Sequence, residues 1–301
     1  MRVTVVGGGV IGLSCALRLA QRGHGVTVLT GHDVAQTTSA VAGGLVYPRF
    51  AEPAQRTFDW TNRSYTAFRR LSGQPDTGVR MLPGRILRRV PKRIPSWSPA
   101  VGGVRRQTDL PPPWQDAVSF TPPLVHMARY LRWLAGQAAA AGVRVERRMV
   151  DALPVAEADV VVNAAGLGAG MLAGDDSVIP ARGQLVHVAD SELDTWVVDE
   201  DNFSYVLPHG DHLVCGGTEE PGNDSLEPDP ATTADILRRC AQLVPEVAGA
   251  EVLGVRVGLR PYRPEIRLER VGSIVHCYGH GGVGVTVSWG CADEVADLVG
   301  E

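Results

Sequence analysis

A glycine-rich turn near the N-terminus constrains the fold of this 301-residue chain more than any other feature. A β-branched apolar run at residues 2–6 predicts a buried parallel strand, and a helical pattern of apolar residues then extends to Gly23. A second strand is expected at residues 26–29. Between the first strand and the helix stands a GxGxxG sequence, formed by Gly7, Gly8, Gly9, Val10, Ile11 and Gly12. Together these segments predict a βαβ unit of about 30 residues.

The glycines of this turn favour dinucleotide binding. Gly7 permits the tight turn, Gly9 lets a pyrophosphate approach the backbone, and Gly12 lets helix and strand pack closely. The helix N-terminus then offers free N–H groups to the anion. At the end of the second strand, however, Thr30-Gly31-His32 replaces the acidic residue that would bind the adenosine ribose, and Asp33 comes late. The ribose contact is left unassigned, which weakens a nicotinamide interpretation.

Composition predicts an ordinary globular protein, with 44% apolar and 21% charged residues. A net charge of −4 gives no reason to expect nucleic acid or an anionic membrane as partner. No run approaches the roughly 18 apolar residues of a membrane-spanning helix. The first residues lead directly into the glycine turn, so we expect no signal peptide, and the five cysteines form no CxxC pair. We therefore expect a reduced, cytoplasmic compartment.

Several cofactor chemistries lack the residues they need. Lys92 is the only lysine and lies in a basic, proline-flanked stretch, so neither a Schiff base with pyridoxal phosphate nor a phosphate-binding GxxxxGK[ST] loop is available. The eight histidines are scattered without a metal-ligand spacing, so no metal is expected. Residues 80–106 hold eight basic residues and no acid, with Trp97 as their only aromatic residue. This run predicts a solvated hairpin in preference to a nucleic-acid surface.

Two further segments combine polar and very small residues. Thr37, Thr38 and Ser39 offer hydroxyl groups just past the second strand, either to a ligand or to a local turn. Ala42, Gly43 and Gly44, directly before Leu45, have almost no side-chain bulk, so the backbone there can lie against a flat ring, although close packing explains it equally well. A second glycine-rich loop precedes a last helix expected at residues 290–299, and includes Gly281, Gly282, Gly284, Val285 and Thr286.

Arg260 is the strongest candidate for a substrate-binding residue. It lies in an apolar run before a proline, where an unpaired guanidinium is costly. Its planar fork suits a bidentate contact with a carboxylate. The alternative is a structural ion pair with an acid elsewhere in the chain.

These motifs, in order along nearly the whole chain, resemble the D-amino-acid oxidase family of FAD enzymes. Further similar segments lie between the two glycine-rich loops, at residues 160–166, 182–184 and 205–208. The resemblance implies an α/β fold, with a Rossmann-like FAD-binding βαβ domain and a discontinuous, strand-rich α+β substrate (cap) domain. The expected division gives the FAD-binding domain residues 1–75, 121–179 and 270–301, and the cap domain residues 76–120 and 180–269.

The resemblance also implies roles for individual residues. Arg260 and Tyr205 would bind the substrate α-carboxylate, and the carbonyl of Gly282 would receive the amine. Thr286 matches a residue that contacts the flavin ring. Besides the two glycine-rich loops and residues 37–45, the expected FAD contacts include Val150 and Ala165.

Two segments depart from the family pattern. Residues 198–204 are shorter than the active-site lid of the eukaryotic enzymes and carry an acidic stretch in place of a second lid tyrosine, which favours a more open site. Tyr47 and Arg49 match positions around the substrate side chain. Arg49 either pairs with a second carboxylate of an acidic substrate, or points to solvent or pairs with Glu52.

The implied activity is oxidative deamination of a D-amino acid to the 2-oxo acid, with oxygen as the electron acceptor and ammonia and hydrogen peroxide as products. A flavin oxidase or dehydrogenase acting on another amine-bearing intermediate is the alternative, followed by a non-catalytic flavin-binding protein. The sequence leaves a homodimer open. Beyond the opening unit it predicts helices at residues 54–71, 122–141 and 231–243, and strands near 143–150 and 159–163.

Overall fold

The computed structural model describes residues 1–48, 51–189 and 192–300. The predicted βαβ unit is present: β1 (Arg2–Val6) leads through the glycine turn into α1 (Val10–Gln21), and β2 (Gly25–Thr30) lies parallel to β1. The strand β9 (Val160–Asn163) pairs in parallel on the other side of β1. Since both neighbours of β1 are parallel, its carboxyl end is the edge at which a dinucleotide site is expected.

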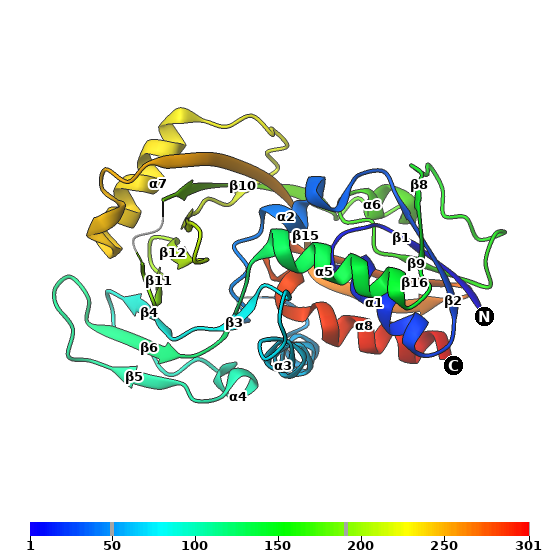
Figure 1. Ribbon diagram of the computed structural model, residues 1–301, viewed down its shortest axis with the longest axis horizontal. Helices are drawn as coiled ribbons and strands as arrows, with labels where there is room; N and C mark the ends of the chain where they lie inside the picture. The colour runs from blue at the N-terminus through cyan, green and yellow to red at the C-terminus, as the bar shows by residue number, and fades with distance from the viewer. Residues whose placement is uncertain (49–50, 190–191, 301) are drawn as a thin grey trace.

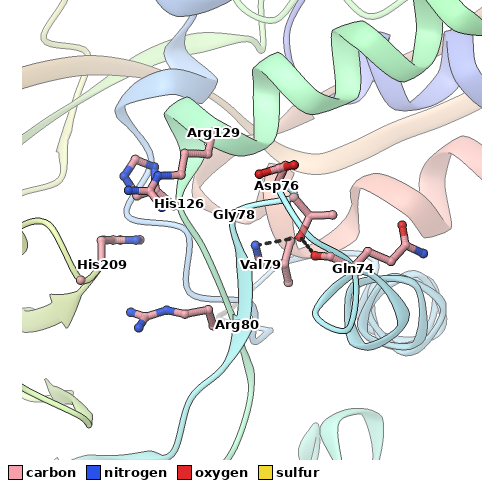
Figure 2. A pocket seen from close by; sticks show the side chains of 10 residues that line it. Gln74, Asp76, Gly78, Val79, Arg80, His126, Arg129 and His209 are labelled. Atoms are coloured by element: carbon pink, nitrogen blue, oxygen red, sulfur yellow. Dashed lines mark hydrogen bonds between the residues drawn. The ribbon is translucent and has the colours of Figure 1, made fainter.

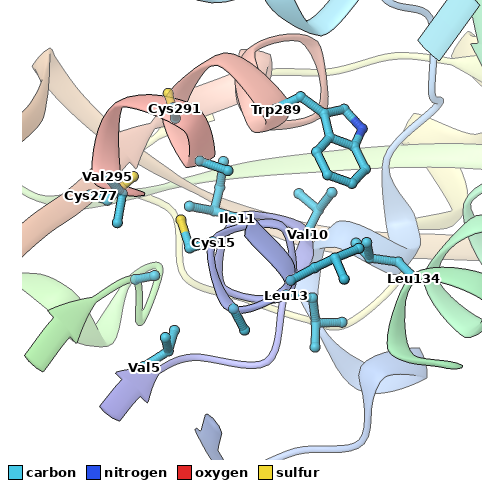
Figure 3. Packing of buried hydrophobic residues seen from close by; sticks show 14 of the residues in the cluster. Val5, Val10, Ile11, Leu13, Cys15, Leu134, Cys277, Trp289, Cys291 and Val295 are labelled. Carbon is cyan, nitrogen blue, oxygen red and sulfur yellow. The ribbon is translucent and has the colours of Figure 1, made fainter. Parts of the chain in front are cut away.

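One lobe of the molecule is a parallel layer covered by helices, on the right in Figure 1. Its strands run in the order β16-β9-β1-β2-β8, where β8 is Arg144–Arg147 and β16 is Ile274–His280. Both chain ends lie in this lobe. The helices α1, α5 (Met127–Ala140) and α8 (Gly284–Gly300) contribute to its apolar core, in which Leu13, Leu134 and Trp289 are almost fully buried (Figure 3).

The other lobe is a strand-rich region, on the left in Figure 1, that continues the same sheet. Here the order is β5-β6-β4-β11-β12-β13-β10-β15. The helix α7 (Pro230–Leu243) packs on this region through Ile236 and Cys240. The 20-residue strand β15 (Val252–Val271) pairs first with β10 and then with β16, so a single strand joins the two lobes.

The other elements include the strands of the strand-rich lobe and the 18-residue helix α3. They are η1 (Val34–Gln36), α2 (Thr38–Val41), α3 (Ala54–Leu71), β3 (Val79–Met81), β4 (Gly84–Arg88), α4 (Ser98–Val101), β5 (Arg105–Gln107), β6 (Asp116–Phe120), β7 (Pro123–Val125), α6 (Gly168–Ala173), β10 (Ile179–Val188), β11 (Trp196–Asp199), β12 (Ser204–Pro208), β13 (Leu213–Gly216), β14 (Glu220–Pro221), η2 (Pro245–Val247) and η3 (Gly281–Val283). The mixed α/β fold class expected from sequence is confirmed.

Two predicted helix boundaries are wrong. The last helix begins at Gly284 rather than at residue 290, and Gly290 lies inside it at a close crossing with α3. A Cβ at Gly290 would lie 2.3 Å from the carbonyl oxygen of Trp60, and the Gly290 N–H donates to Ser64 Oγ over 2.9 Å. The helix expected from residue 122 begins at Met127, because Pro123–Val125 form β7 and pair with β3.

The predicted solvated hairpin at residues 80–106 is wrong in part: β4 and β5 each pair with β6, whereas Arg85, Lys92 and Arg105 are exposed as expected. Arg88 is 2% exposed, and its Nε donates to Glu200 Oε2 over 2.5 Å. Arg89 bonds both oxygens of Asp199, at 2.8 and 2.9 Å. The acids that neutralise this basic run come from distant parts of the chain. No helix in the described ranges has the length and apolar character needed to cross a membrane.

Candidate active site

The N-terminal glycine turn is held tightly against the sheet. Gly7 has φ of +120°, and a Cβ there would lie 2.2 Å from the carbonyl oxygen of Ala164. A Cβ at Gly12 would lie 1.9 Å from the carbonyl oxygen of Gly7. Both positions therefore exclude any side chain, as the predicted roles in the turn and in helix–strand packing require.

The hydroxyl segment after β2 lies against this turn. The Val10 N–H donates to Ser39 Oγ over 3.0 Å, so Ser39 accepts from an N–H of the first turn of α1 that has no acceptor within the helix. Thr38 Oγ1 donates to the carbonyl of Leu259 over 3.1 Å, which ties α2 to β15. Thr37 Oγ1 makes the local alternative, a bond of 2.7 Å to the carbonyl of Val34.

The end of β2 confirms that an acid is missing there. Thr30 Oγ1 donates to the carbonyl of His32 over 2.8 Å, and a Cβ at Gly31 would lie 2.5 Å from Met149 Cε. Asp33 stands at the start of η1 and pairs with Arg147. Asp33 is thus engaged in turn and surface interactions.

Val150 and Ala165, the two expected FAD contacts in the middle of the chain, lie together. Both pack against a small apolar cluster that contains Val6 at the end of β1. This position is beside the glycine turn, as the prediction requires, while contact with FAD stays a prediction.

The second glycine loop reaches the same region from the far end of the chain. Gly281 has φ of +49°, and only Tyr262 lies within 4 Å of its Cβ position. Gly284 begins α8, so Val285 and Thr286 belong to the first helical turn and not to the loop. Thr286 Oγ1 donates to the carbonyl of Tyr47 over 3.3 Å. The open backbone at Gly281 and Gly282 fits a cofactor with a flat ring.

Arg260 lies on β15 opposite Ala181 of β10. Its guanidinium covers Gly183, where a Cβ would lie 2.5 Å from Cζ, and its Cδ lies 3.6 Å from the Cβ position of Gly282. Nη1 donates to the carbonyl of Thr218 over 3.0 Å. Within the described ranges no carboxylate forms an ion pair with Arg260, whereas the neighbouring Arg182 pairs with Glu220 at 3.1 Å.

Tyr205 packs against the end of β13, next to Thr218, whose carbonyl Arg260 bonds. On β12 it pairs with Gly216, and a Cβ on Gly216 would lie 2.1 Å from the Tyr205 Cζ. The Cβ position of Gly217 is 2.9 Å from the tyrosine hydroxyl, and that of Gly43 is 3.9 Å from it. Tyr205 and Arg260 thus pack on consecutive residues, Gly217 and Thr218, and the turn at residues 43–45 lies beside them.

The predicted side-chain pocket is described only in part. The Tyr47 ring lies 5.7 Å from that of Trp97 and 6.2 Å from that of Phe120, between ring centroids. Arg49 lies outside the described residues. The Glu52 carboxylate accepts the Ala54 N–H at the start of α3 over 2.7 Å. Trp97 and Phe120 were not identified from sequence, because nothing in their spacing relates them to Tyr47.

Sequence reasoning also missed His209. Its Nε2 lies 3.1 Å from the carbonyl oxygen of Gly43, and burial lowers its pKa to about 3, so this nitrogen donates as part of a neutral imidazole. Leu207 reaches Gly43 as well, with Cδ1 3.0 Å from the Cβ position. The hairpin that carries Tyr205 therefore supports the 43–45 turn. The available signal was the position of His209 directly after residues 205–208, one of the segments that resemble the family.

Two glycine-rich turns from opposite chain ends, at the same edge of a parallel layer, are typical of a dinucleotide-dependent enzyme of the α/β class. The model of the FAD dependent oxidoreductase family (DAO) matches residues 2–298, so this chain belongs to that family and its cofactor is FAD.

Similar proteins agree with this family assignment. The chain is 46% identical over 312 residues to a D-amino-acid oxidase of Rubrobacter xylanophilus, covering 99% of this chain and 96% of that protein. It is 44% identical to a D-amino-acid oxidase of Streptomyces coelicolor, with 98% and 96% covered. The crystal structure of glycine oxidase from Bacillus cereus superposes with a TM-score of 0.83 at 23% identity, over 99% of this chain and 94% of that one.

Proposed function

We propose that this chain oxidises a D-amino acid to the corresponding 2-oxo acid, with release of ammonia and hydrogen peroxide. The observation that carries the proposal is Arg260, a partly buried guanidinium beside the second glycine loop that no carboxylate of the described residues neutralises. A substrate carboxylate would supply the missing charge. The D-amino-acid oxidases at 44–46% identity over nearly the whole chain support the same activity.

In this proposal three groups orient the substrate. Arg260 binds the α-carboxylate, the hydroxyl of Tyr205 donates to the same carboxylate, and the carbonyl of Gly282 accepts a hydrogen bond from the amine. Contacts of Arg260 with the Gly282 position and of Tyr205 with Gly217 support a shared site. These contacts fix the direction of the substrate α-hydrogen, and this orientation lowers the barrier to its transfer as hydride. Because the hydrogen leaves as hydride, no side-chain base is required.

The residues that would hold FAD come from five segments. They are Gly7, Gly8, Gly9, Val10, Ile11 and Gly12, then Thr37, Thr38 and Ser39, then Gly43, Gly44 and Leu45, then Val150 and Ala165, and finally Gly281, Gly282, Gly284, Val285 and Thr286. When bound, FAD supplies at N5 the acceptor for a hydride from the substrate α-carbon and passes the electrons to oxygen. The first turn of α8 contains no acidic residue, so its positive end is free to stabilise negative charge.

We also propose a reducing, cytoplasmic location. All five cysteines are free and buried, as expected for a chain that makes no disulfide framework.

Replacing Arg260 tests the carboxylate assignment. The variant Arg260→Ala should keep bound FAD but lose about 10²–10⁴-fold in kcat/KM for D-amino acids, because a charged contact to the substrate is lost. Arg256→Ala is the matched control, since Arg256 lies four positions earlier on β15 with an exposed side chain, and it should keep wild-type kinetics. Wild-type kcat/KM in Arg260→Ala would rule out the assignment.

A further inference from the structure

Four histidines gather where the β12–β13 turn meets the start of α5. His187 lies on β10, His209 and His212 flank the turn, and His126 directly precedes α5. Ring centroids lie 4.4 Å apart for His187 and His212, 5.3 Å for His209 and His212, and 5.4 Å for His126 and His212. No spacing in the sequence predicts this cluster, because its members come from three separate segments.

Asp211 lies between two of these rings. Its Oδ1 is 2.7 Å from His212 Nδ1, and its Oδ2 is 3.2 Å from His126 Nε2. These ligand atoms of His126, Asp211 and His212 all lie within 4.8 Å of one another. Nitrogen and oxygen ligands of a tetrahedral zinc ion are roughly 3.3 Å apart, since each is about 2.0–2.2 Å from the metal. Small side-chain adjustments would therefore place all three around one ion.

A cavity adjoins the cluster and gives it access to solvent. It has a volume of about 350 Å³ and is lined by His126, Arg129, His209 and Arg80, among others. Figure 2 shows these four side chains directed toward the same space. Of the three proposed ligands His126 lines this cavity, and the Asp211 side chain is 46% exposed, so solvent can supply a further ligand.

We propose that His126, Asp211 and His212 bind one divalent transition-metal ion of the zinc class. Two imidazoles and a carboxylate are ligands typical of zinc sites, with a fourth position left for water. The ion would connect the β12–β13 turn to the start of α5. This site is independent of the function proposed above, although His209, on the same turn, bonds the Gly43 carbonyl.

Arg129 opposes metal binding at this site. Its Nη2 lies 2.9 Å from Asp211 Oδ2, so a guanidinium already pairs with the carboxylate. The Arg129 side chain is 53% exposed and can turn out into solvent when an ion arrives. Because like charges repel, removal of this guanidinium should strengthen metal binding. Removal of either imidazole should weaken metal binding, because a ligand is lost.

Calorimetric titration of ZnCl₂ into the FAD-loaded enzyme, after dialysis against a chelator and then chelator-free buffer, tests the proposal. We expect one ion per chain, at least tenfold weaker binding in His126→Asn and His212→Asn, and several-fold tighter binding in Arg129→Gln. His32→Asn, which changes an exposed histidine outside the cluster, should bind zinc like the wild type. Anomalous diffraction at the zinc edge should place the ion between the three ligands.

Zinc bound elsewhere, no stoichiometric binding, or wild-type affinity in both histidine variants would overturn the proposal. Circular dichroism and the flavin spectrum control for misfolding of each variant. Arg129→Gln keeps the test decisive, because a misfolded protein would not gain affinity.

Discussion

At the residue scale, glycines shape the site by leaving room for other groups. Gly183 is the clearest case, because the Arg260 guanidinium occupies the space of its missing side chain. Gly216 does the same for the ring of Tyr205. The two side chains proposed to bind the substrate carboxylate are thus positioned by backbone that has no Cβ. A glycine loses more backbone conformational entropy on folding than any other residue, so each such position lowers the stability of the fold.

Gly183→Ala should therefore damage substrate binding without touching the substrate. The new Cβ would lie 2.3 Å from Arg260 Nη1 and displace the guanidinium. A misplacement of about 1 Å can lower turnover about 100-fold, so we expect a loss of that order in kcat/KM with FAD retained. Gly136→Ala, inside α5 with nothing within 4 Å of the Cβ position, is the control. Equal steady-state kinetics in both variants would contradict the account.

Buried histidines predict a loss of stability in mild acid. His280 ends β16 directly before the second glycine loop, and burial lowers its pKa from the usual 6.5 to about 4. Between these values the unfolded chain binds a proton that the folded chain does not, so stability falls as the pH drops from 6.5 toward 4. The slope from one such group is at most about 1.4 kcal/mol per pH unit.

Urea unfolding followed by tryptophan fluorescence at pH 7.5, 6 and 5 measures this contribution. His280→Gln should show a shallower pH dependence than the wild type, since the glutamine side chain does not titrate. If the two proteins lose stability in parallel over this range, His280 is not the source.

At the element scale, helices were predicted correctly where the pattern of residues within the segment determines them, and wrongly where contacts with distant residues do. The helix at residues 54–71 was predicted correctly, because its buried residues recur at helical spacing. The start of α8 was missed, because β-branched residues after Gly284 form a helix only through packing against α1 and α3. The role of Arg88 was missed because its partners Asp116 and Glu200 are 28 and 112 residues away.

Arg88 should therefore be a stability determinant of the strand-rich lobe. Asp116 is 0% exposed and depends on Arg88 and Arg106 for neutralisation, and the Arg106 guanidinium helps to keep its pKa below the usual value despite burial. Arg88→Ala leaves that buried carboxylate with one partner fewer, so we expect a loss of about 3–5 kcal/mol. Arg105→Ala, an exposed arginine on β5, should change stability by less than about 0.5 kcal/mol. Similar melting temperatures for the two variants would contradict this role.

Ion pairs next to Arg88 also hold the segment at residues 198–204, which was expected to be a shortened lid. Asp199 bonds Arg89, and Asp201 bonds Lys92 at 3.1 Å, so the acidic stretch is attached to the turn after β4. The acids that replaced a second lid tyrosine therefore have structural partners. That the site is open to product release stays a prediction.

At the scale of the whole molecule, the site is built from segments that the chain order separates widely. Turns near residues 7–12 and 281–284 lie at the same edge of the sheet, because β1 and β16 both flank β9 in parallel. Arg260 reaches Gly282 because β15 runs from the strand-rich lobe to β16. Sequence motifs identified these segments individually. The aromatic neighbours of Tyr47 and the histidine cluster, in contrast, follow only from the assembled sheet.

The division into an FAD-binding domain (1–75, 121–179 and 270–301) and a cap domain (76–120 and 180–269) remains a proposal. One sheet passes through both regions, and β15 crosses the boundary assigned at residue 270. The two regions therefore share backbone hydrogen bonds as well as side-chain contacts.

Anaerobic mixing of the FAD-loaded enzyme with single amino acids tests the central claim most directly. The panel should contain D-alanine, D-aspartate and their L-enantiomers, followed by readmission of air. We predict that at least one D-amino acid bleaches the flavin absorbance, that its L-enantiomer does not, and that colour returns rapidly in air. Preference for D-aspartate would favour an acidic-substrate role for Arg49, and slow return of colour would indicate a dehydrogenase. Failure of every D-amino acid in a broad panel to bleach bound FAD would contradict the account.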